Sequence, residues 1–262
     1  MKNLKLLGLA AAVAFFFTSC DDEEEQDVTA PVIQEATIDG EDHDIMVAAG
    51  DEMHLDVHVT DNEALGELKM DVHDIFDGHD HKSAVKWSEV MTVQLSGKEQ
   101  HVHEHMDVPQ DAMAGPYHVI FRLIDEEGNE GEFAELDFMI SNASQPQINI
   151  TDPDFGSEVD APKGSTLILQ GTITDDTDLE EILIKLTEEH DDHDHKNSTE
   201  GEIYEADFDL TGTNDTSWDF QADGNVNIAI PANAETGHYK LEVVAVDNEG
   251  NMNIFEGEVD IM

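Results

Sequence analysis

The sequence contains two copies of one long segment. A shift of 114 residues brings Thr60-Asp61 onto Thr174-Asp175 and His79-Asp80-His81-Lys82 onto His193-Asp194-His195-Lys196, without a gap. Beyond these residues the shift grows to 122, which we explain by an insertion near 210–225 in the second copy. A period of this length is that of a whole domain, so we predict a tandem pair of domains and not a solenoid.

Apolar residues alternate with polar ones within each copy. Tyr117, Val119, Phe121 and Leu123 occupy every second position of one run, which is the period of a strand with one buried face. Roughly seven such runs in about 110 residues, without an amphipathic helix, are typical of an immunoglobulin-like sandwich. Turns such as Asp125-x-x-Gly128-Asn129 resemble those of bacterial immunoglobulin-like domains. The predicted fold class is therefore all-β, with two tandem immunoglobulin-like β-sandwich domains.

The chain begins with a predicted secretion signal. Lys2 and Lys5 precede an apolar run over 6–17 that is too short to span a membrane. The single cysteine, Cys20, follows where a lipoprotein signal peptidase would cleave and a lipid would be attached. We expect a lipoprotein signal peptide over 1–19, an acidic tether over 20–29, a first domain over 30–141 and a second domain over 146–262.

Charge and lipidation define the expected surroundings of the protein. It has 62 Asp and Glu against 11 Lys and Arg, a formal net charge of −51, which repels phosphate backbones and excludes nucleic acid as a partner. The lipid at Cys20 is the expected membrane anchor. The run Asp21-Asp22-Glu23-Glu24-Glu25 resembles the surface-export signal of Bacteroidetes lipoproteins, which implies the outer membrane and the cell surface. An outer-membrane protein is a candidate partner there.

Ten of the 14 histidines lie in the first copy. If Val72 and Val119 point into the core, His73 and His118 point out of the same sheet from adjacent antiparallel strands. Neutral imidazole is the commonest zinc ligand and also suits copper and nickel. We predict a transition-metal site with zinc as the favoured cofactor and copper and nickel as alternatives. Its predicted ligands are His73, His79, His81 and His118. At the same end of the sandwich we expect His43, His54 and His105 as well.

A second candidate metal cluster lies on the other predicted sheet, where two strands carry histidine at alternate positions. Its members are His54, His58, His101, His103 and His105. Alternating polar residues on an exposed sheet face would give the same pattern without any metal. The second copy has Thr187 and Lys240 where the first has His73 and His118, so the first site is predicted to be degraded there.

One stretch resembles a known family. The segment from His73 to His81, followed by Trp87, Gly115-Pro116-Tyr117-His118 and the Asp125 turn, is similar to a Bacteroidetes lipoprotein family catalogued as domain of unknown function 4625. The resemblance covers roughly 31–140 and returns, weaker, over the second copy. It implies a lipoprotein signal and immunoglobulin-like domains, and it implies no activity.

The function that follows is non-catalytic capture of a divalent transition metal at the cell surface. His101-Val102-His103-Glu104 resembles the His-x-His strand of copper-zinc superoxide dismutases, but the cysteine pair and the glycine-rich segment of that family are missing. Nucleophile elbows and helical His-Glu-x-x-His motifs are also missing, so we do not expect an enzyme. Calcium binding through Asp61, Asp125 and their copies Asp175 and Asp247 at the opposite pole is a weaker alternative. The runner-up function is a metal-independent adhesion or accessory lipoprotein that binds protein or glycan.

Overall fold

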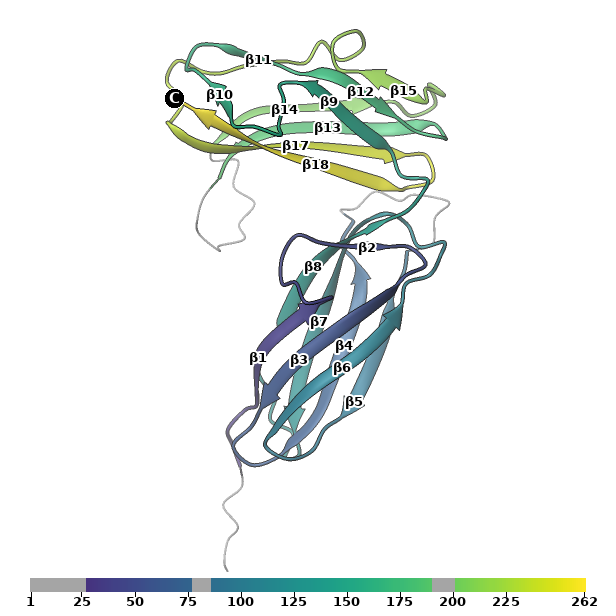
Figure 1. The fold of residues 1–262 in the computed structure, drawn as a ribbon, viewed down its shortest axis with the longest axis vertical. Coiled ribbons are helices and arrows are strands. Elements are labelled where there is room, and N and C mark those ends of the chain that lie inside the picture. Colours follow the sequence, from purple (N-terminus) through teal and green to yellow (C-terminus); the bar gives the residue numbers. More distant parts are fainter. Residues whose placement is uncertain (1–26, 77–85, 190–200) are drawn as a thin grey trace, which may run out of the picture.

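The computed structural model describes residues 27–76, 86–189 and 201–262 of the protein. Two β-domains follow one another along the chain, and the strands of the second cross those of the first at a steep angle (Figure 1). No helix in the described residues is long and apolar enough to cross a membrane. The predicted signal peptide, Cys20, His79 and His81 lie outside the described residues.

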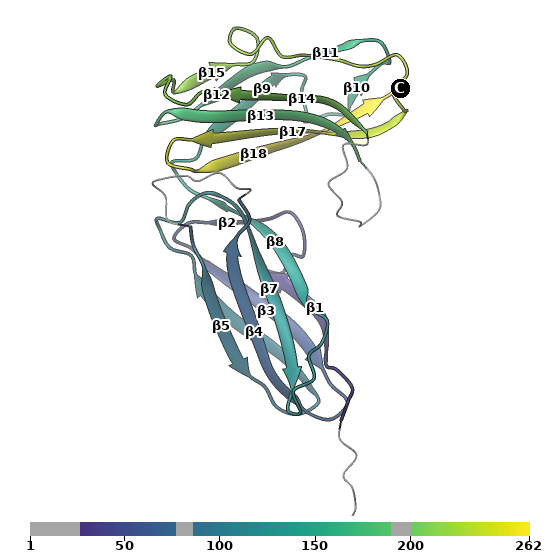
Figure 2. The same ribbon diagram turned by 180° about the vertical axis from the view of Figure 1, so that it is seen from behind.

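The first domain is a sandwich of a three-stranded and a five-stranded sheet (Figure 2). The sheets have the orders β1-β3-β6 and β2-β8-β7-β4-β5. Strand β2 runs parallel to β8, and the other neighbours are antiparallel. The strands are β1 (Val32–Ile38), β2 (Ile45–Ala48), β3 (Glu52–Thr60), β4 (Leu65–Asp74), β5 (Glu89–Gln94), β6 (Glu99–Asp107), β7 (Gly115–Asp125) and β8 (Ala134–Ser141).

The core of this domain comes from the predicted alternation. Leu55 and Val59 on β3 are fully buried, as are Met70 and Val72 on β4 and the same face of β7. Residues between these positions face solvent or the sheet edges. Burial of a side chain of this size stabilises a fold by about 1.5 to 3 kcal/mol, so the in-out pattern fixes which face of each strand is free to carry a site.

A buried tyrosine closes the end of each sandwich near the start of its longest strand. The Tyr117 hydroxyl donates to the Met113 carbonyl at 3.0 Å and accepts from Trp87 N at 3.4 Å. Burial raises the pKa of Tyr117 to about 12. The Tyr239 hydroxyl donates in the same way to the Glu235 carbonyl at 3.3 Å. A tyrosine that bonds back to the preceding segment is a hallmark of immunoglobulin-like sandwiches.

The second domain repeats the five-stranded sheet of the first. That sheet has the order β10-β18-β17-β13-β14, and the opposite layer is divided into β15-β12-β9 and β11-β16. The strands are β9 (Gln147–Asp152), β10 (Val159–Ala161), β11 (Thr166–Ile168), β12 (Gln170–Thr174), β13 (Leu179–Glu188), β14 (Glu202–Asp209), β15 (Ser217–Asp219), β16 (Asn227–Ala229), β17 (Gly237–Asp247) and β18 (Met252–Ile261).

The insertion in the second copy explains the divided layer. Residues 220–226 lie between β15 and β16, which pair with β12 and β11 in place of one continuous partner strand. At the break, Gly171 has φ +139°, and a Cβ there would lie 2.0 Å from the Asn149 carbonyl oxygen. Only glycine allows this approach of β12 to β9. The predicted fold class, two tandem β-sandwich domains, is confirmed.

The domains are joined through Asn251, whose side chain is buried at the junction. Its Oδ1 accepts from Ala114 N at 3.1 Å and from Asn142 Nδ2 at 2.7 Å, and Met252 N donates to the Ala114 carbonyl at 2.9 Å. Because Ala114 immediately precedes β7, this contact lies at the end of the first domain that carries His118.

Candidate metal centre

His73 and His118 face each other on the outer surface of the five-stranded sheet. They are direct partners in the antiparallel register of β4 and β7, and their inward neighbours Val72 and Val119 are fully buried. Side chains of directly opposed residues lie closer together than any other cross-strand pair. The strand alternation therefore brings these two imidazoles together, as the sequence predicts.

The two rings approach through their Nε2 atoms. The Nε2 atoms of His73 and His118 are 2.6 Å apart, and the ring centroids are 4.0 Å apart with an interplanar angle of 77°. The His118 side chain is 12% exposed and that of His73 is 41% exposed. The His118 side chain is thus largely screened from water, whereas solvent reaches that of His73.

Carboxylates lie at the other nitrogen of each ring. His118 Nδ1 contacts Glu135 Oε1 on the adjacent strand β8, and His73 Nδ1 faces Asp71 Oδ1 at 3.8 Å. A carboxylate beside Nδ1 favours the tautomer with the proton on that atom. Both Nε2 atoms then present lone pairs toward the same point, which only a proton or a metal ion can stabilise.

Two carboxylates of β8 also lie around the His118 ring. His118, Glu135 and Asp137 each offer a ligand atom, and these three atoms lie within 4.8 Å of one another. Asp137 is the register partner of His118 on β8. Two nitrogens bound at 2.0 to 2.1 Å to a tetrahedral zinc are about 3.3 Å apart. The rings would therefore need to separate by less than about 1 Å to hold an ion between their Nε2 atoms, with further ligands or water completing its shell.

Sequence reasoning missed Glu135, Asp137 and Asp71. The alternation Glu135-Leu136-Asp137-Phe138 carries the relevant signal, because β8 exposes Glu135 and Asp137 on the face that His118 shares. The two loop histidines of the predicted set, His79 and His81, lie outside the described residues. Lys86, the first described residue after these histidines, pairs through Nζ with Asp74 Oδ1 at 2.9 Å, next to His73.

The second predicted cluster forms on the outer face of β3 and β6, but it divides into two groups. His54 opposes His105 and lies with Glu52, and His58 opposes His101 and lies with Glu99. The ring centroids are 4.4 Å apart in the first pair and 4.1 Å apart in the second. His103 lies between the pairs and contacts Asp56 instead. The five histidines thus share a sheet face and not a single centre.

The histidine-bearing strand ends share one pole, yet they open on opposite faces of the sandwich. His73 and His118 belong to the five-stranded sheet, whereas His54 and His105 belong to the three-stranded sheet. His43 is largely exposed and contacts Asp42 at 2.6 Å. The expected gathering of these residues at one end therefore does not make one site, because the two outer faces are separated by the core.

The second domain has an ion pair in place of the histidine pair. Thr187 opposes Lys240 in the register of β13 and β17, and Lys240 Nζ contacts Glu256 Oε1 at 2.8 Å. Glu256 holds the position on β18 that Glu135 holds on β8, since each is two residues from the strand partner of the central side chain. The first domain therefore has the candidate ligands and the second lacks them, so that the second domain can serve as a control.

A third group in the second domain was not expected from the sequence. His238 Nδ1 lies 2.9 Å from Glu258 Oε1 and 2.6 Å from Asp260 Oδ1. The charge of Asp260, aided by that of Glu258, raises the pKa of the His238 imidazole. The side chain is 65% exposed, so this group is a solvated ion-pair cluster at the end of β17 remote from the junction.

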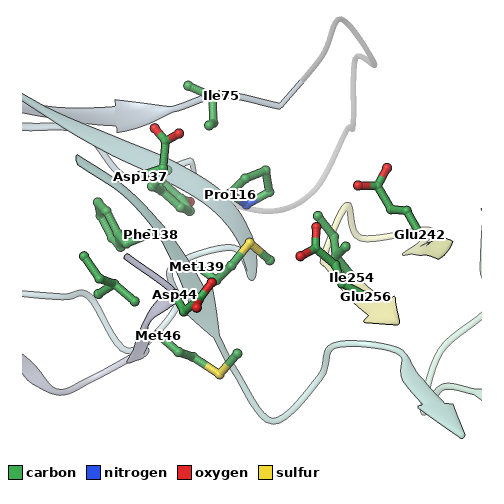
Figure 3. Close-up of a pocket in the computed structure, with 12 residues that line it drawn as sticks. Asp44, Met46, Ile75, Pro116, Asp137, Phe138, Met139, Glu242, Ile254 and Glu256 are labelled. Carbon is green, nitrogen blue, oxygen red and sulfur yellow. The ribbon is translucent and has the colours of Figure 1, made fainter. Parts of the chain in front are cut away.

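A pocket of about 630 Å³ opens where the two domains meet (Figure 3). Asp137 contributes to its wall, so the pocket borders the candidate centre. Residues of both domains line it, and most are apolar: Ile45, Met46, Ile75, Pro116, Tyr117, Phe138, Met139 and Ile254, together with the acids Asp44, Asp137, Glu242 and Glu256.

One protein-family model matches nearly all of the described chain. It is the model called domain of unknown function (DUF4625), and it matches residues 18–141 and again residues 134–262. The chain belongs to the DUF4625 family. Both copies of the repeat are thus DUF4625 domains, in agreement with the resemblance drawn from the residues around His73 and Gly115. None of the curated protein sequences matches this DUF4625 protein.

Solved structures similar to this DUF4625 protein include proteins of several kinds. The fibronectin(III)-like modules of Clostridium thermocellum CbhA are 14% identical over 87% of this chain and 93% of theirs, with a TM-score of 0.26. A chimeric titin Z1Z2-Z1Z2 tandem is 14% identical over 88% of this chain and 98% of its own, with a TM-score of 0.32. A Niemann-Pick type C2 protein from Japanese carpenter ant is 11% identical over 43% of this chain and 94% of its own, with a TM-score of 0.32.

Proposed function

We propose that this DUF4625 protein is a non-catalytic, lipid-anchored surface protein whose first domain captures a divalent transition metal, with zinc favoured over copper and nickel. His73 and His118 are the proposed nitrogen ligands, Glu135 and Asp137 lie beside the His118 ring, and His79 and His81 are the further candidates from the sequence. The observation that carries the proposal is the 2.6 Å approach of the two Nε2 atoms, with a carboxylate on the far side of each ring.

Charge supports a metal at this point. Two neutral imidazoles and two carboxylates carry a formal charge of −2, which a divalent ion cancels. A proton shared between the two rings would also fill the gap, but it would still leave a formal charge of −1. The whole chain, with a formal net charge of −51, attracts cations from a distance and raises their local concentration. Capture of a dilute cation is therefore the role that suits both the site and its surroundings.

Substitution of the carboxylate behind His118 tests the site. We expect Glu135→Gln to lower zinc affinity about 10- to 100-fold, because carboxylates that orient a ligand histidine contribute this much. Isothermal titration of zinc into an untagged chain without residues 1–20 measures the change. The matched control is Glu256→Gln, which alters the equivalent carboxylate where Lys240 replaces the histidine and should leave zinc affinity unchanged.

The same titration separates the two candidate functions. Equal losses in the two variants would place zinc on the general acidic surface and contradict the proposed centre. No zinc binding by the wild-type chain, together with no metal in the purified protein by elemental mass spectrometry, would favour a metal-independent adhesion or accessory protein.

Lipidation has its own test. We expect Cys20→Ser to move the protein from the membrane fraction to the soluble fraction, because the lipid is the proposed anchor. Detergent-phase partitioning measures this shift. Wild-type protein on intact cells should be digested by added protease. Partitioning of the processed variant with membranes would contradict the anchor, and full protection of the wild type from protease would contradict surface exposure.

A further inference from the structure

Two buried oxygens in this protein lack any hydrogen-bond partner, and they are the same atom in the two repeats. Within the described residues, Asp61 Oδ2 and Asp175 Oδ2 are the two buried side-chain nitrogen or oxygen atoms without a partner. Asp61 directly follows β3, and Asp175 directly follows β12. Buried polar atoms are almost always paired, because leaving one unpaired costs free energy. Recurrence at one position of a repeat makes this a feature of the fold.

In the first domain the unpaired oxygen belongs to a group of three acids. Asp27, Asp61 and Asp125 each offer a carboxylate oxygen, and these oxygens lie within 4.8 Å of one another. Asp125 is 3% exposed. The group lies at the end of the first domain opposite His73 and His118, where β3 and β7 end (Figure 1).

Neutral donors hold these acids in place without cancelling their charge. Asp125 accepts from Asn129 N at 2.7 Å and from Asn129 Nδ2 at 2.6 Å. Asp61 Oδ1 accepts from Glu63 N at 2.8 Å and from Ala64 N at 2.7 Å. Asn62 Nδ2 donates to both oxygens of Asp27 at 3.1 Å. In the described part of the chain no Lys or Arg side chain pairs with any of the three acids.

We propose that Asp27, Asp61 and Asp125 bind a calcium ion. Calcium takes six to eight oxygen ligands at about 2.3 to 2.6 Å, so its ligand oxygens lie within about 5 Å of one another. The three carboxylates satisfy this spacing, the unpaired Asp61 oxygen gains a partner, and water completes the shell. The site is independent of the proposed zinc centre, with which it shares no residue.

The bound ion would fix the N-terminal segment to the first domain. Asp27 is the only one of the three acids that precedes β1, whereas Asp61 directly follows β3 and Asp125 ends β7, in the opposite sheet. Asn129 Nδ2 already donates to the Asp27 carbonyl at 3.1 Å. The ion would thus join both sheets to the residues that precede β1.

The second domain provides a natural comparison, because it lacks the third acid. Pro146 begins that domain as Pro31 begins the first, which places Asn142 where the first domain has Asp27. Asn142 turns its Nδ2 toward Asn251 Oδ1 at 2.7 Å and the Ala112 carbonyl at 3.1 Å. The pair Asp175 and Asp247 therefore remains without a third carboxylate, and we assign no calcium to it.

One tryptophan in each domain allows the two to be followed separately. Trp87 and Trp218 are the two tryptophans of the chain and both are buried. In a Trp218→Phe chain without residues 1–20, treated with chelator, calcium chloride should raise the urea midpoint of the Trp87 signal. Half of the effect should appear at about 10⁻⁴ to 10⁻³ M calcium, the range of extracellular calcium modules. Sodium chloride at matched ionic strength controls for screening of the net charge.

Asp27→Asn places in the first domain the residue that the second domain has at this position. It should raise the calcium concentration at half of the effect at least tenfold, while the domain stays folded. Loss of the response in this variant, with the Trp218 signal of a Trp87→Phe chain unmoved by calcium, supports the site. A calcium response equal in wild type and Asp27→Asn would overturn it. So would a wild-type response no larger than that to sodium chloride.

Discussion

A protein that carries both His73→Ala and His118→Ala should bind zinc at least about a thousandfold more weakly than the wild type. Four-ligand structural zinc sites bind with about 10 to 16 kcal/mol, so two ligands account for several kcal/mol, and each 1.4 kcal/mol is a factor of ten. Zinc titration calorimetry at pH 7 measures the loss. Binding should also weaken in acid, because protons compete with the metal for imidazole.

The second domain supplies both the control and the reverse experiment. Thr187→Ala with Lys240→Ala removes the equivalent side chains and should leave zinc affinity unchanged. Thr187→His with Lys240→His should instead create a second site, since β13 and β17 hold these positions in the same register and Glu256 is already in place. Retention of wild-type affinity by the double alanine variant would refute the centre, whatever the graft does.

Much of the fold was predictable because strand alternation is a local property. Val72 and Val119 had to be buried for the strands to have a core, and this alone sent His73 and His118 to the same outer face. The repeat then gave the domain number. The divided layer of the second domain was less accessible, because it depends on where residues 220–226 leave the sheet and on the close approach at Gly171.

The site was only half predictable, for a physical reason. Sequence spacing brings together residues of adjacent strands whose register is known, as it did for the two histidines. Glu135 and Asp137 come from a third strand whose register follows from the whole sheet, so no short pattern indicates them. The five histidines of β3 and β6 show the converse limit, since sharing a face does not place residues at one point when they are spread along two strands.

Asp27 illustrates a third limit. It lies at the end of the predicted acidic tether, where one acid among many does not indicate a binding site. Its role is visible only after Asp61 and Asp125, more than 30 residues and nearly 100 residues further on, are brought to the same pole. Without that contact, the acids of the turns resemble any solvated loop.

The stability of the second domain should fall as the pH rises from about 4 to about 6. Burial raises the pKa of Asp247 from its ordinary value to about 6, and the negative charge of Asp175 adds to the effect. Because the folded state holds this proton more tightly than the unfolded state, the contribution is complete below about pH 4 and is lost by about pH 6. A shift of about two pKa units corresponds to roughly 3 kcal/mol.

Urea unfolding of a Trp87→Phe chain, followed by Trp218 fluorescence, measures this slope in the second domain. Asp247→Asn is the comparison, because it keeps the shape of the side chain and removes its titration. Repulsion among the other acids also weakens the fold as pH rises, but it acts on both proteins and cancels in their difference. The wild type should therefore lose stability relative to Asp247→Asn by roughly 3 kcal/mol between pH 4 and pH 7. Parallel pH curves for the two proteins would mean that Asp247 is already ionised at pH 4. In that case the buried pair with Asp175 would need a cation in the second domain as well, and the distinction drawn from Asn142 would be wrong.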